Sequence, residues 1–123
     1  MDVLVTLVEV WEAKHARVPS EVQIRAIAFQ EGDVWVVQGI EYDIAAHASD
    51  PAKVPAAFTR AILENAAIAK HLGRKPLEGI KPAPDRYREM FERASTEVRP
   101  VELAVDSSPP LIAAMDIRLA ETV

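Results

Sequence analysis

The stretch that most limits how this chain can fold runs from Gly32 to Asp50 and reads GDVWVVQGIEYDIAAHASD. It opens with a short turn in which Gly32 supplies the positive φ that a tight hairpin needs. Apolar, β-branched and aromatic residues then recur through Val34–Ile40 and again through Tyr42–Ala48. This pattern predicts two consecutive strands. Gly39, inside the first of them, indicates a bulge or a close backbone approach.

The residues before this stretch predict a further strand that pairs with it. From Glu21 to Gln30, one set of alternate positions holds Val22, Ile24, Ala26 and Ala28. The other set holds Gln23, Arg25, Ile27 and Phe29. Period-two alternation with β-branched residues is typical of a strand, and the glycine turn that follows favours a hairpin. The expected core is therefore an antiparallel three-stranded meander.

The residues after this stretch predict a long helix. Asp50 is an N-cap candidate and Pro51 stands at the first helical position. Pro55 lies further in, so we expect a first turn of 3₁₀ type or a regular helix that starts near Pro55. Apolar and small residues at spacings of three and four predict the face that packs on the sheet. They are Phe58, Ala61, Ile62, Asn65, Ile68, Ala69 and Leu72.

The remainder of the chain predicts an α+β domain. Lys75–Pro84 reads as a connector anchored by Leu77 and Ile80, and Asp85–Ser95 shows helical spacing. Alternation predicts two late strands at Val101–Asp106 and Met115–Leu119, with a turn at Asp106–Pro110 between them. Met1–Pro19 is compatible with a strand, a short helix or an apolar arm. We divide the chain into an N-terminal element (1–19), a β-β-β-α core (20–75) and a C-terminal part of the same domain (76–123).

Composition excludes several classes of function. A chain of 123 residues without cysteine forms one domain with no disulfide and no cysteine-ligated metal. The formal net charge of −5 disfavours direct nucleic-acid binding, which depends on clustered cations. The apolar N-terminal residues lack the basic start of a signal peptide and the length of a membrane span. We therefore expect a cytoplasmic protein.

The densest polar set in the chain is Glu41, Asp43, His47 and Asp50. Carboxylates beside a histidine suit a divalent metal or acid–base chemistry, but the spacing matches no metal motif. Within a strand, Glu41 and Asp43 would share one face, which is also the pattern of a solvated surface. No nucleophile elbow and no glycine-rich phosphate loop occurs in the sequence. Residue chemistry alone therefore identifies no catalytic residue and no cofactor.

The strand at Val22–Phe29, the glycine turn, the segment VWVVQGIEYDIAAHASD and the Ala-rich helix together resemble the HicB-like antitoxin family. The resemblance covers about Val22–Leu72, and the segment KPAPDRYREMF is similar to a subgroup of the family. It implies a compact β-β-β-α core like a reduced ribonuclease H fold without that enzyme's metal-binding carboxylates. The C-terminal region predicts two strands, not the helix pair of a helix-turn-helix, so no DNA-binding domain is expected.

The resemblance implies a non-catalytic module that forms homo-dimers or higher homo-oligomers and binds a small HicA-type ribonuclease toxin. We take the aromatic, acidic and histidine residues of the central stretch as candidate interaction residues. They are Trp35, Glu41, Tyr42, Asp43 and His47. Two alternatives stay open. One is a metal-dependent nuclease with Glu41 and Asp43 as ligands and a further carboxylate from Asp33 or Asp50, and the other is a self-associating domain without a toxin partner.

Overall fold

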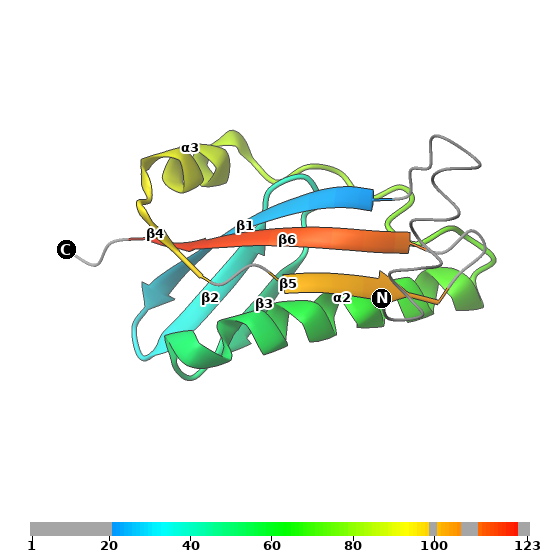
Figure 1. The fold of residues 1–123 in the computed structure, drawn as a ribbon, viewed down its shortest axis with the longest axis horizontal. Coiled ribbons are helices and arrows are strands. Elements are labelled where there is room, and N and C mark those ends of the chain that lie inside the picture. The colour runs from blue at the N-terminus through cyan, green and yellow to red at the C-terminus, as the bar shows by residue number, and fades with distance from the viewer. Residues whose placement is uncertain (1–20, 99–100, 107–110, 121–123) are drawn as a thin grey trace, which may run out of the picture.

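The computed structural model describes residues 21–98, 101–106 and 111–120. The N-terminal element expected at 1–19 and most of the turn expected at Asp106–Pro110 lie outside these ranges. Two helices lie on opposite faces of one mixed sheet (Figure 1). This arrangement confirms the α+β fold class. Among the described helices, none has the length and apolar character needed to cross a membrane.

The predicted meander forms the first half of the sheet. The strands are β1 (Glu21–Glu31), β2 (Val34–Gly39) and β3 (Ala45–Ala48), each antiparallel to the next. Gly32 has φ 64° in the turn between β1 and β2, the left-handed conformation that glycine adopts without steric cost. The hairpin prediction is confirmed.

The third strand is shorter than its sequence pattern predicts. Tyr42 and Asp43 lie in a bend, and β3 begins only at Ala45. The bend closes tightly because the Gly39 N–H donates to the Ile44 oxygen at 2.8 Å and the Ile44 N–H donates to the Tyr42 oxygen at 2.7 Å. The prediction that Glu41 and Asp43 share a strand face is therefore wrong.

The long helix starts as the two prolines predict. A 3₁₀ turn, η1 (Pro51–Lys53), precedes α2 (Val54–His71), so that Pro55 falls in the first helical turn, where no N–H donor is needed. Asp50 occupies the N-cap position of η1, but its side chain makes no capping hydrogen bond. It lies 3.7 Å from the Lys53 ammonium instead.

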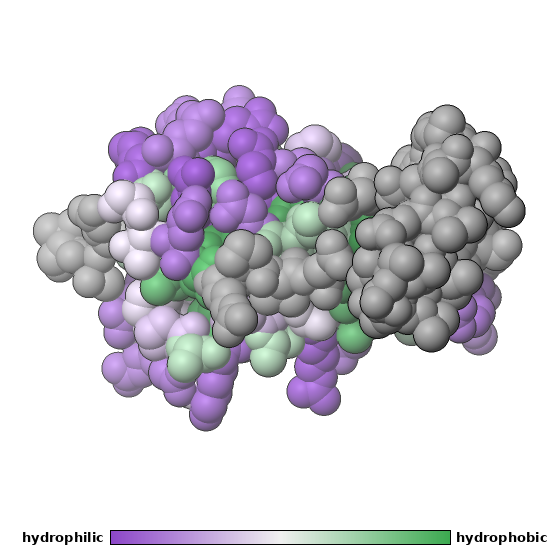
Figure 2. Space-filling model, viewed as in Figure 1, coloured by the Kyte–Doolittle hydropathy of each residue, from purple (hydrophilic) through white to green (hydrophobic). Residues whose placement is uncertain are grey.

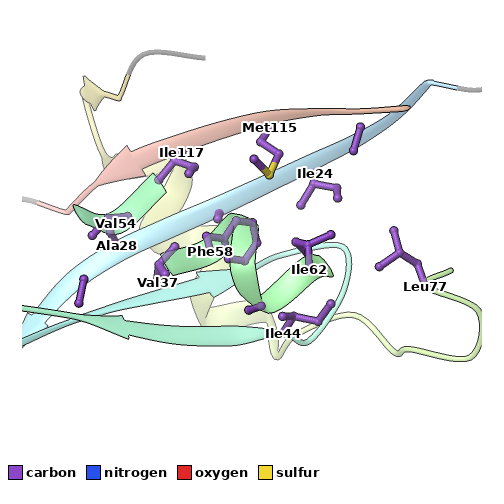
Figure 3. Packing of buried hydrophobic residues seen from close by; sticks show 14 residues of the cluster. Ile24, Ala28, Val37, Ile44, Val54, Phe58, Ile62, Leu77, Met115 and Ile117 are labelled. Atoms are coloured by element: carbon purple, nitrogen blue, oxygen red, sulfur yellow. The ribbon is translucent and has the colours of Figure 1, made fainter. Parts of the chain in front are cut away.

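The residues of α2 that pack on the sheet differ from the predicted set at both ends of the helix. Val54 and Ala66 are buried together with the predicted Phe58, Ala61 and Ile62. Ile68 and Leu72 are 60% and 56% exposed, because α2 continues beyond the part of the helix that covers the core. Figure 3 shows Val54, Phe58 and Ile62 directed from α2 toward Val37, Met115 and Ile117.

The late strands complete the same sheet. β6 (Leu111–Leu119) pairs in parallel with β1, and β5 (Val101–Val105) pairs antiparallel with β6. A two-residue strand that the sequence did not predict, β4 (Thr96–Glu97), pairs with the C-terminal end of β6. The order across the sheet is β3–β2–β1–β6, with β4 and β5 on the outer side of β6.

The second face of the sheet is covered in part by α3 (Asp85–Arg93). Phe91 of α3 is buried in a small cluster with Ile27, Ile40 and Ala94. Its ring lies between two guanidinium groups, with the Arg118 Cζ 4.2 Å and the Arg25 Cζ 5.4 Å from the ring centroid. The connector before α3 is held by Leu77, which is buried in the main core, as its sequence predicted.

Candidate interaction surface

The five candidate interaction residues lie at two ends of β2 and on both faces of the sheet. Trp35 and Tyr42 pack against the main core on the face that α2 covers. His47 pairs with Val36 and therefore lies on the opposite face from Trp35. Glu41 and Asp43 follow the far end of β2. The fold thus does not bring these five side chains into one site.

Glu41 is used to hold the bend after β2. One of its carboxylate oxygens accepts a hydrogen bond from the Arg25 N–H at 2.6 Å, and the other accepts one from the Arg25 Nε at 2.5 Å. Both side chains are about two-thirds buried, with 34% and 26% of their surfaces exposed. Because both oxygens have a donor from the same residue, Glu41 joins β1 to the bend as a structural partner of Arg25.

Asp43 makes a second polar contact at the same end of β2. Its Oδ1 accepts a hydrogen bond from the Gln38 Nε2 at 2.9 Å, while its N–H donates to the Lys81 oxygen at 2.7 Å. The Gln38 amide also donates to the Gly39 oxygen at 3.1 Å, and Gln38 is the one buried polar residue in the described part of the chain. These bonds fasten the connector to the bend, and they account for a buried amide that would otherwise be costly.

The described residues hold no group of three or more histidine or carboxylate side chains placed to share a metal ion. The nuclease hypothesis needs a third carboxylate beside Glu41 and Asp43. Asp33 lies in the β1–β2 turn and Asp50 lies just before η1, both at the opposite end of β2 from Glu41. The strand register therefore separates the carboxylates that this hypothesis would bring together.

An apolar surface that the sequence did not single out lies on the β-sheet face opposite α2. Phe29, Val36 and His47 form one row across β1, β2 and β3, because Phe29 pairs with Val36 and Val36 pairs with His47. Val34 is two residues along β2 on the same face and is 38% exposed. We call Phe29, Val34, Val36 and His47 the open strand surface.

The helix α3 reaches only one border of the open strand surface. The Tyr87 ring stacks on Phe29, with a centroid separation of 6.0 Å and an interplanar angle of 21°. Beyond this contact, Phe29 and Val36 stay partly exposed and His47 is exposed. Figure 2 shows mainly hydrophilic residues over α3, whereas the outer side of α2 is mixed and ends in the exposed Ile68 and Leu72. A partly exposed aromatic and two valines therefore lie side by side on one face of the sheet, and aromatic residues are enriched in protein-binding surfaces.

A signal for this surface was present in the sequence. In the second half of β1 both sets of alternate positions hold apolar residues, Ala26 and Ala28 in one set and Ile27 and Phe29 in the other, although the second set begins with Gln23 and Arg25. A strand with one solvated face would carry polar residues in one of the sets. Two apolar sets predict burial on both faces, and α3 covers Ile27 fully but Phe29 only in part, through Tyr87.

No family model, no curated protein and no solved structure matches the chain.

Proposed function

We propose that this chain is a non-catalytic protein–protein interaction module of the HicB-like type, and that its partner binds the open strand surface. The observation that carries the proposal is the pair of partly exposed apolar residues Val34 and Val36 beside Phe29, on a sheet face that the described residues cover only in part. Burying such residues against a partner removes apolar area from water, at roughly 25 cal/mol for each Å².

The two carboxylates at the other end of β2 already accept hydrogen bonds, which supports a binding role over a catalytic one. Glu41 is satisfied by Arg25, and Asp43 accepts from Gln38. A catalytic base needs a free position within hydrogen-bond reach of a substrate proton. The order β1, β2, β3 and α2 is also the order of the β-β-β-α core that the family resemblance implies. That resemblance makes a small HicA-type ribonuclease toxin the partner to test first.

The test is co-expression of this chain with the product of a small basic reading frame beside its gene. We expect the two proteins to co-elute and the nuclease activity of the partner to be suppressed. A Val36→Lys variant should lose co-elution, because the substitution places a charge in the apolar surface that the partner must cover. The matched control is Gln23→Lys, which adds the same charge at an exposed position of β1 on the same sheet face.

Two results would contradict the proposal. In the first, the wild-type proteins elute separately while the partner remains an active nuclease. In the second, Val36→Lys and Gln23→Lys both bind as the wild type does. Thermal unfolding of each variant separates loss of binding from loss of the fold.

A further inference from the structure

The outer edge of β3 carries free backbone hydrogen-bonding groups at known positions. Hydrogen-bonded and non-hydrogen-bonded pairs alternate along an antiparallel ladder. Gly39 and Ile44 form a hydrogen-bonded pair, since the Gly39 N–H donates to the Ile44 oxygen. Along the register, Val37 with Ala46 is then the next hydrogen-bonded pair. Ala45 and His47 fall in non-hydrogen-bonded pairs, so their N–H and C=O groups are directed away from β2.

The pairing of β1 with β2 gives the same alternation of hydrogen-bonded and non-hydrogen-bonded positions along β2. The Ile40 N–H donates to the Arg25 oxygen at 2.8 Å, so hydrogen-bonded pairs between β1 and β2 include Phe29 with Val36. The N–H and C=O groups of Val36 therefore point toward β1. This agrees with the N–H and C=O groups of its partner His47 pointing away from β2. In the part of the chain that the structure describes, no strand pairs with the outer edge of β3.

The two edges of the sheet differ in their protection. On the far edge, β4 and β5 include Glu97 and Glu102. The register on β6 also shifts by one residue between β4 and β5, because Thr96 pairs with Leu119 whereas Val101 pairs with Met115. Charged residues and register breaks are the usual devices against edge-to-edge pairing. β3 has the sequence AAHA, with no lysine, no carboxylate and no proline. Within the described residues, the short length of β3 is the one feature that protects this edge.

We propose that β3 pairs antiparallel with β3 of a second copy of this chain, across a twofold axis at Ala46. This inference rests on the proposed function, because it names one partner of the interaction module and the edge that the partner uses. Ala45 and His47 are equally spaced about Ala46. In the dimer, Ala45 therefore lies opposite His47 of the second copy, and His47 lies opposite Ala45 of the second copy. Their outward groups then form roughly four hydrogen bonds.

The edge suits a second copy in both shape and charge. The side chains that meet across the axis are alanine methyl groups and imidazoles, which are small and include no charged pair of like sign. Each copy also brings its own open strand surface to the same side of the extended sheet, since Phe29, Val36 and His47 share one face. The pairing therefore joins two apolar surfaces into one larger surface for a further protein.

Sedimentation velocity and light scattering over a wide range of concentration test the pairing on the full chain. We expect a monomer–dimer equilibrium for the wild type. His47→Pro removes an outward N–H without touching the ladder to β2, and should weaken dimerisation by roughly tenfold or more, since each dimer loses two hydrogen bonds. The matched control is His47→Ala, which loses the same side chain, keeps the N–H and should dimerise as the wild type does.

A second set of variants tests the antiparallel register and does not depend on proline. Ala45→Lys places lysine on the edge and should weaken the dimer. The double variant Ala45→Lys, His47→Glu should restore the dimer, because each lysine then lies opposite a glutamate of the second copy. Restoration supports this register over pairing in parallel or through the sheet faces.

The inference is overturned if the wild type is monomeric at all concentrations. It is also overturned if neither His47→Pro nor Ala45→Lys changes the dissociation constant, or if an extended peptide of another protein occupies the edge in place of a second copy. A monomeric wild type that still loses its toxin-type partner on Val36→Lys leaves the proposed function standing. The two proposals can therefore fail separately.

Discussion

Gly39 is the residue whose replacement tests the geometry of the central bend most directly. A Cβ at this position would lie 2.6 Å from the Tyr42 oxygen, 3.2 Å from the Phe58 Cζ and 3.3 Å from the Ile44 oxygen. Ordinary contacts between carbon and a carbonyl oxygen lie at about 3.3–3.6 Å. The first distance is a clash with backbone, and the second is a tight contact with a fully buried ring.

The neighbours of Gly39 have little freedom to move away. The Tyr42 oxygen accepts the Ile44 N–H, and the adjacent Asp43 N–H donates to the Lys81 oxygen. Overpacking costs about 1–3 kcal/mol, and the rigid neighbours place Gly39→Ala near the upper end of that range. The smaller entropy of the unfolded alanine chain offsets about 0.4–1 kcal/mol of this cost. The expected net loss in free energy of unfolding is therefore about 2 kcal/mol or more.

Urea unfolding followed by circular dichroism measures this loss, and Gly32→Ala is the matched control. Gly32 has φ 64° and no atom within 4 Å of a built Cβ, so its replacement has a conformational cost and no clash. The left-handed conformation costs about 1–2 kcal/mol for alanine, and the same entropy offset reduces the net loss to roughly 1 kcal/mol. If Gly39→Ala proves as stable as Gly32→Ala, the close approach at the bend is refuted.

Three further substitutions test the core and the polar contacts. Phe58→Ala should lower the free energy of unfolding by about 3–5 kcal/mol, because the side chain is fully buried in the main core. Ile68→Ala should change it by less than about 0.5 kcal/mol, and an equal loss at both sites in urea unfolding would contradict the packing of α2. Glu41→Gln should cost about 1–2 kcal/mol through the weakened contact with Arg25 and should leave Mg²⁺ binding by calorimetry unchanged. Exposed Glu89→Gln is its control, and a loss of Mg²⁺ binding confined to Glu41→Gln would favour the nuclease hypothesis.

Elements built from local rules could be predicted from the sequence. Each of these elements depends on residues that are close together in the sequence. They are the glycine turn, the alternation in β1 and β2, and the two prolines around the start of α2. The 3₁₀ start of the helix followed from the position of Pro55 alone. These predictions are confirmed because their causes, backbone sterics and hydrophobic period, do not depend on the rest of the fold.

The start of β3 could not be predicted in the same way. Tyr42 and Ile44 are both apolar, and both pack against the main core, one from the bend and one just before the strand. The period-two pattern therefore continues through residues that are not in a strand. The bend depends on hydrogen bonds across it, from Gly39 to Ile44, and on the connector bond from Asp43 to Lys81.

The order of the strands in the sheet could not be predicted from the sequence pattern either. Ala113, Met115 and Ile117 alternate in the same way whether β6 pairs with β1, with β2 or with another chain. The parallel pairing of β6 with β1 joins residues about ninety positions apart, from Val22 with Ala113 onward. Contacts at such separation leave no periodic signal within a single sequence.

The five candidate residues were chosen for their chemistry, and exposure was not weighed. Glu41 and Asp43 carry the groups that catalysis uses, but in the fold Glu41 accepts a hydrogen bond from Arg25 and Asp43 accepts one from Gln38. Phe29, Val34 and Val36 carry no reactive group, yet they are the residues that remain partly exposed on a flat apolar face. Of the five candidates, His47 alone belongs to the open strand surface.

The same sheet order explains why β3 is available for pairing. β1 is internal because β2 and β6 occupy its two sides, and β2 is internal because β1 and β3 do. The strands after α2 add beyond β6, so none of them can reach the other end of the sheet without displacing the meander. A strand that joins β3 therefore displaces nothing within the described fold, and it gains backbone hydrogen bonds while the β1–β2–β3 ladder stays intact.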